Sequence, residues 1–273
     1  MRCRTAIGLL LLLPYALCGC DSKSESSALP TVSVTNTYLE SAVRELCGDS
    51  VRVFGLAPPG MCPGHFDLTP EQFRRLLGSK LVLRFDFQQN LDSAVQRIRE
   101  RVVSIQGRTG LCIPQTYLET CREVMPFVET TLVTPEVLQV RLAALEVRLE
   151  RLSETARSRV RDAGLDRAKV LVSHHQSTFA EWLGLEVVGT FRSAEVMTPG
   201  EIEACLAAAR HGEAHLVIAN LQEGTDLARN MARTVGARLV VFSNFPDTRA
   251  DAEHAFDHLV LSNVDHLLDP QDP

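Results

Sequence analysis

Histidines follow two of the apolar segments that the sequence predicts to be strands. His65 comes after the segment 51–54 and a loop rich in proline and glycine, and His174 and His175 come directly after the segment 169–173. Neutral imidazole is a common ligand of borderline transition metals. Because ligands of open α/β sheets bind beyond the carboxyl ends of the strands, these positions make a metal site the first chemistry to consider.

Polar side chains follow two further predicted strands. They are Asn220, Gln222 and Glu223 after the segment 216–219, and Ser243, Asn244 and Asp247 after the segment 239–242. Adjacent side chains on an extended strand point to opposite faces, so we expect only one of His174 and His175 to face a shared site. The other histidines lie on predicted helices or their ends, and we interpret them as surface residues.

Short apolar segments alternate with helical patterns along the chain. The predicted strands are 32–34, 51–54 and 81–84 in the first half, and 169–173, 186–190, 216–219 and 239–242 in the second. Continuous apolar runs of this kind are typical of parallel strands that are covered on both faces. The sequence therefore predicts an α/β fold with two lobes, each a mostly parallel sheet flanked by helices.

One long helix is predicted between the two halves, over residues 134–164. It begins at Thr134-Pro135, ends near Gly164 and carries a single apolar stripe. The stripe consists of Leu138, Leu142, Leu145, Leu149, Leu152, Ala156 and Val160. A coiled-coil dimer is the alternative, but α/β segments on both sides favour a rigid strut within one chain, which would resist wide hinge motion. The predicted lobes are residues 31–133 and 165–273.

The N-terminus has the order of an export signal. Two arginines precede an apolar stretch over residues 7–17, which ends in Leu17-Cys18-Gly19-Cys20. This order resembles a bacterial lipobox, and it predicts a signal peptide over 1–19, a lipidated Cys20 and a serine-rich tether to residue 30. An ordinary secretory signal is the alternative. The predicted protein is exported and anchored by lipid to a bacterial membrane, facing the periplasm or the cell exterior.

Composition limits the class of partner and the thiol chemistry. The 273 residues carry a formal net charge of −6, which argues against nucleic acid as a partner. We find no Gly-x-Ser-x-Gly motif, P-loop or nucleotide-binding glycine motif, so we do not expect an enzyme. Five cysteines follow Cys20, and their disulfide pattern stays open because an odd number cannot all pair internally. They are Cys47, Cys62, Cys112, Cys121 and Cys205.

Longer segments, from about Val32 to Leu268, resemble the solute-binding proteins of bacterial zinc and manganese ABC importers. The segment 31–60 ends in Pro-Pro-Gly, and the next one places His65 four residues before Thr69-Pro70. The segments 170–191 and 216–247 are similar to the strands and helices of the family's second lobe. The resemblance implies that His65 and His175 are metal ligands, with His174 as the alternative to His175.

Two positions depart from the family pattern. Gln115 stands where a histidine is expected, and Ser243, followed by Asn244, stands where a carboxylate is expected. Cys62 lies three residues before His65 and could add a thiolate. The resemblance therefore implies a degenerate site of His65, His175, Gln115 and Ser243, with a weaker affinity than three histidines and one carboxylate would give.

The resemblance also implies a function. The chain would be a monomer that captures zinc or another divalent transition metal between its lobes and delivers it to the permease of an ABC importer. Manganese is a further candidate, and a thiolate from Cys62 would suit copper(I) as well. The alternative is a solute-binding-like lipoprotein that has lost metal capture and serves as a docking or adhesion module.

Overall fold

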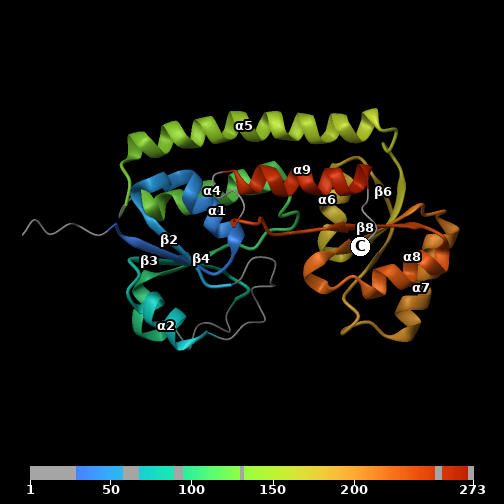
Figure 1. Cartoon of the computed structure of the whole chain (residues 1–273), viewed down its shortest axis with the longest axis horizontal. Helices are drawn as coiled ribbons and strands as arrows, with labels where there is room; N and C mark the ends of the chain where they lie inside the picture. Colours follow the sequence, from blue (N-terminus) through green and yellow to red (C-terminus); the bar gives the residue numbers. More distant parts are fainter. Residues whose placement is uncertain (1–28, 58–67, 89–94, 130–131, 250–253, 270–273) are drawn as a thin grey trace, which may run out of the picture.

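The computed structural model describes residues 29–57, 68–88, 95–129, 132–249 and 254–269, and these form two lobes under one long helix (Figure 1). The N-terminal sheet has the order β2-β1-β3-β4, and the C-terminal sheet has the order β6-β5-β7-β8. All strand pairs are parallel. The predicted fold class is confirmed. The predicted signal peptide, Cys20, Cys62 and His65 lie outside the described residues.

The two sheets are built from short strands, and all of these except β4 were predicted from the sequence. In the N-terminal lobe the strands are β1 (Thr31–Val34), β2 (Arg52–Gly55), β3 (Leu81–Phe85) and β4 (Val102–Ile105). In the C-terminal lobe they are β5 (Lys169–Ser173), β6 (Glu186–Phe191), β7 (Leu216–Asn220) and β8 (Arg238–Phe242). In each sheet the first strand lies between the second and the third, so the strand ends that follow one another along the chain are not always neighbours in space.

Helices cover the faces of both sheets. The first lobe contains α1 (Thr37–Cys47), α2 (Pro70–Leu77) and α4 (Pro114–Glu129), with short 3₁₀ turns η1 (Gly48–Ser50) and η3 (Gln96–Arg101). The second contains α6 (Ser177–Trp182), α7 (Pro199–His211) and α8 (Asp226–Val235). The sequences Thr69-Pro70 and Thr198-Pro199 each predict the start of a helix, with a hydroxyl at the N-cap and proline at the first helical position. Thr69 and Thr198 indeed form capping boxes with Gln72 and Glu201.

The long helix α5 (Pro135–Asp162) runs along both lobes (Figure 1). Most of its predicted stripe is buried against α1, α4 and α9, with Leu142 partly buried against the same core. Because the stripe is covered by helices of the same chain, α5 is a strut within the molecule. The same burial removes the apolar surface that a coiled-coil dimer would need along this stripe.

The last helix, α9 (Ala255–Leu268), joins the lobes a second time, because it packs against β8, α5 and α1. Near its start, the Phe256 ring stacks on Tyr117 of α4, with the ring centroids 3.9 Å apart. Tyr38 of α1 meets both rings edge-on. All three aromatic side chains are fully buried. The contact between the lobes is therefore a packed core, in keeping with limited hinge motion.

Candidate functional site

A cleft of about 990 Å³ lies between the lobes. The first lobe contributes Phe87 and residues 107–111 to its lining. The second lobe contributes the segments that follow β5, β7 and β8, including His174, His175 and Asn244. The cleft thus lies at the carboxyl ends of the strands, where the sequence predicts a ligand site.

His174 and His175 both line the cleft and both are exposed. The expectation that only one of them would face it is wrong, because they lie in the 3₁₀ turn η4 (His174–Gln176) and not on an extended strand. Their ring centroids are 5.7 Å apart. The tight turn therefore presents two imidazoles at the end of β5.

A carboxylate that the sequence did not assign as a ligand lies beside His175. Glu223 ends the 3₁₀ turn η5 (Leu221–Glu223) after β7, and its Oε1 lies 3.5 Å from Nε2 of His175. Its Oε2 accepts a hydrogen bond of 2.5 Å from the hydroxyl of the buried Ser173. The side chain is thereby held toward His175. In the sequence, the signal for Glu223 is its position after a predicted strand. Its proximity to His175 follows only from the pairing of β7 with β5.

Gln115 and Ser243, the other two predicted ligands, are not placed beside His175. Gln115 is exposed on α4, and its Nε2 donates to the hydroxyl of Ser153 on α5 at 3.4 Å. The Ser243 hydroxyl accepts from Nε2 of Gln222 at 3.0 Å and donates to the carbonyl of Phe245 at 3.1 Å. Ser243 lines a neighbouring hollow of about 560 Å³. The three predicted ligands that the structure describes are His175, Gln115 and Ser243. They therefore do not lie together at one site.

Neutral amides form the floor of the cleft on the second lobe. Gln176 is fully buried, and its Nε2 donates to Oδ1 of Asn244 at 3.1 Å and to Oδ1 of Asn220 at 3.4 Å. Asn244 and Asn220 line the cleft above it. Because these amides hydrogen-bond one another, the Asn244 side chain is part of the floor of the cleft. The negative charge of the nearby second-lobe wall comes from Glu223 and Glu195.

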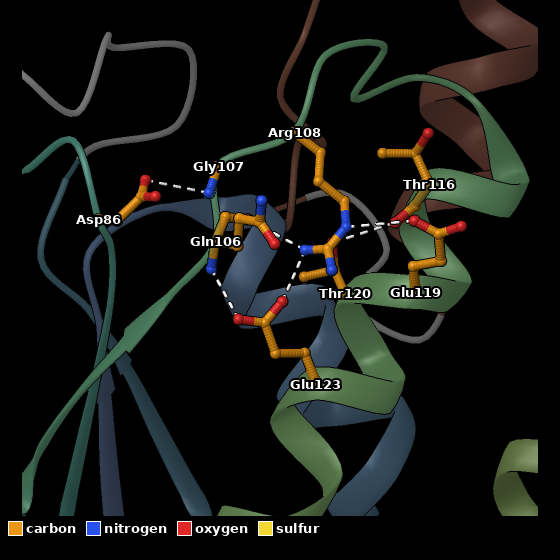
Figure 2. A network of polar contacts seen from close by, with 8 residues as sticks. All are labelled: Asp86, Gln106, Gly107, Arg108, Thr116, Glu119, Thr120 and Glu123. Carbon is orange, nitrogen blue, oxygen red and sulfur yellow. Dashed lines mark hydrogen bonds and ion pairs between the residues drawn. The ribbon is translucent and has the colours of Figure 1, made fainter.

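Arg108 fixes the opposite wall of the cleft (Figure 2). Its guanidinium binds Glu123 at 2.6 Å and Glu119 at 3.2 Å, both on α4. Glu123 also accepts from the backbone N–H of Gln106 at 2.7 Å, and Asp86 accepts from that of Gly107 at 3.0 Å. Two carboxylates offset the charge of Arg108, so this wall does not repel a cation.

The side chain of Asn263 on α9 forms hydrogen bonds with the backbone just beyond the edge strand β8. Its Oδ1 accepts from the N–H of Ser243 at 2.9 Å, and its Nδ2 donates to the carbonyl of the same residue at 2.9 Å. The thiol of Cys112 donates to that carbonyl at 3.0 Å. The Asn263 amide thus takes the place of a neighbouring strand. The Cys112 thiol ties the first lobe to the same carbonyl.

Replacing Asn263 with leucine should lower the free energy of unfolding by about 1–3 kcal/mol, because it leaves the backbone groups of Ser243 without this partner. Urea denaturation measures the difference. Asn230→Leu on the exposed face of α8 is the matched control, and it should change stability by less than about 0.5 kcal/mol. Equal stability of the two variants would contradict the assigned role of Asn263.

The cysteines of the described residues are free thiols: Cys47, Cys112, Cys121 and Cys205. Burial raises the pKa of the Cys47 thiol to about 12 and raises the pKa of Cys112 and Cys121 further. Neutral buried thiols are poor metal ligands and nucleophiles. Cys47, Cys112 and Cys121 are therefore part of the packed interior, whereas Cys205 is only partly buried.

Within the described ranges, no group of three or more His, Cys, Asp and Glu side chains is arranged to hold a metal ion. Among the described residues of the cleft, His175 and Glu223 form a pair of such side chains, 3.5 Å apart. None of the helices in these ranges combines the length and the apolar composition that a membrane span requires.

The sequence matches no protein-family model and no curated protein. Solved structures are similar in fold. A zinc-bound deletion mutant of ZnuA superposes with a TM-score of 0.71 at 17% identity, over 90% of this chain and 100% of the other. The cadmium-bound periplasmic metal-binding protein of Candidatus Liberibacter asiaticus gives 0.73 at 11% identity, over 88% and 98%. The chain has the fold of these metal-binding proteins.

Proposed function

We propose that this chain is the extracytoplasmic metal-binding component of an ABC importer. It would capture a divalent transition metal in the cleft between its lobes and deliver the ion to a permease. His175 and Glu223 would be the ligands of the second lobe, and His65 the ligand of the first. Zinc, manganese and cadmium are bound in solved structures of this fold, which supports a divalent cation as the transported ligand.

The separation of His175 and Glu223 carries the proposal. Two ligands that share a tetrahedral zinc ion with bonds of about 2.1 Å are about 3.4 Å apart. The Nε2 and Oε1 atoms are 3.5 Å apart, and both residues line the cleft. Because Ser173 binds the other oxygen of Glu223, the carboxylate is held on the side of His175.

The position of Glu223 changes the metal affinity that we expect for the site. The missing carboxylate after β8 suggested a weakened site, whereas a carboxylate after β7 would supply the attraction to a dication. We further propose that Cys20 carries the lipid that anchors the protein outside the cytoplasm. The soluble part would act as a monomer, with α5 and α9 holding the two lobes at a nearly fixed angle.

Calorimetric titration of the mature domain with zinc and with manganese tests the proposal. We expect Glu223→Gln and His175→Ala each to weaken binding of the preferred ion by about tenfold to a hundredfold, which corresponds to about 1.4–2.7 kcal/mol. Glu195→Gln is the matched control, because it removes one carboxylate from the same cleft without touching the pair. A parent protein that binds neither ion, or a Glu223→Gln variant that binds like the parent, would overturn it.

A further inference from the structure

We propose that the metal enters this cleft as a complex with a small, flat organic chelator, and that Phe87 and Leu221 hold the apolar body of that chelator. This inference rests on the proposed function and names the class of its substrate. His175 and Glu223 would supply the ligands of the second lobe to the metal, and the chelator would supply further donors.

The cleft is large for a metal site. Its volume of about 990 Å³ lies at the upper end of the range of about 300–1,000 Å³ that holds small organic molecules. A bare ion is enclosed by donors at about 2.0–2.3 Å and fills only a small part of such a space. The cleft therefore has room for a larger ligand than an ion.

Phe87 is an aromatic side chain held in an exposed position. It is 56% exposed and lines the cleft from the segment after β3. Its ring stacks on Phe85, with centroids 5.3 Å apart, and lies so close to Gly107 that an added Cβ would meet it at 2.7 Å. Two neighbours fix the ring while much of it faces solvent, as expected of a surface on which a flat apolar ligand stacks.

Leu221 presents apolar surface to the cleft from the other lobe. It is 50% exposed and lies two residues before Glu223 in the same 3₁₀ turn. Phe87 and Leu221 thus place apolar surface on both lobes of the cleft that contains the metal-binding pair. A chelator whose metal is bound by His175 and Glu223 would have its body in the same cleft as this apolar surface.

The charges in the cleft indicate the charge of the complex. Arg108 is offset by Glu119 and Glu123, while Glu195 and Glu223 add negative charge on the second lobe. Negative charge favours a complex that remains positive, because opposite charges attract more strongly in a partly desolvated cleft. A neutral nitrogen chelator, which leaves both charges of the dication in place, fits this requirement better than a carboxylate chelator.

Calorimetry with zinc alone and with the 1:1 complex of zinc and 2,2′-bipyridine tests the inference. We expect the complex to bind the parent protein at least tenfold more tightly than zinc alone. Phe87→Ala should remove most of this gain and leave the affinity for zinc alone unchanged, and Leu221→Ala should remove part of it. Val140→Ala, on the outward face of α5, is the control and should change neither affinity.

The outcomes separate the inference from the function on which it rests. If zinc alone binds through His175 and Glu223 but the complex binds no more tightly, the inference fails and the proposed function stands. It also fails if Phe87→Ala keeps the full gain, or if bipyridine without zinc binds as tightly as the complex. If neither zinc nor the complex binds, the proposed function fails together with it.

Discussion

Replacing Arg148 with methionine is expected to lower the free energy of unfolding by about 3–5 kcal/mol at pH 7. Arg148 of α5 forms an ion pair with Glu45 of α1 and a second one with Asp257 of α9, where its Nε lies 3.2 Å from the carboxylate. The two acidic side chains are only 11% and 18% exposed. Without the arginine, two largely buried carboxylates lose their cation at the junction of three helices.

This loss should depend on pH. Burial raises the pKa of Glu45 and of Asp257, and Arg148 opposes the increase in both. A raised carboxyl pKa means that the folded state keeps its proton longer than the unfolded state, so stability falls as pH rises through that pKa. His254 and His258 also face Asp257 and lower its pKa when charged. The deficit of Arg148→Met should therefore be largest near pH 7 and shrink toward pH 4, where the carboxyls are protonated.

Urea denaturation of the parent and the variant at pH 7 and pH 4 measures both effects. Arg122→Met is the matched control, because Arg122 pairs with Glu146 between side chains that are 47% and 53% exposed. That change should cost less than about 1 kcal/mol, as exposed ion pairs usually do. A deficit of Arg148→Met that is equally large at the two pH values would contradict the assignment to buried carboxylates.

Replacing Phe256 with alanine is expected to destabilise the protein by about 3–5 kcal/mol. Its ring is fully buried and stacks on Tyr117 at an interplanar angle of 4°, so its removal opens a cavity between α9 and α4. The effect should be visible as a lower midpoint of thermal and urea unfolding. Because Phe256 joins α9 to the first lobe, the variant should also unfold less cooperatively.

Phe87→Ala provides the matched control for this cavity, since it removes the same side chain from an exposed position. We expect it to cost at most about 1 kcal/mol, mostly through the lost stacking on Phe85. If Phe256→Ala were no more destabilising than Phe87→Ala, α9 would not be the packed connection between the lobes that the structure describes.

Those parts of the fold that depend on local patterns could be predicted from the sequence. The stripe from Leu138 to Val160 predicted α5, because a period near 3.6 residues places these side chains on one face. Thr69-Pro70 and Thr198-Pro199 predicted two helix starts, because capping involves only residues within one turn. Apolar runs separated by helices predicted parallel strands and two lobes, since buried parallel strands need apolar side chains on both faces.

The set of side chains that meet in the cleft depends on how distant segments pack. Glu223 lies beside His175 because β7 is the sheet neighbour of β5, although β6 comes between them in the sequence. The rotation of α4 places Gln115 against Ser153 of α5, away from the cleft lining. Strand order and helix rotation are set by packing between distant segments, so no local pattern could have assigned the carboxylate of this site.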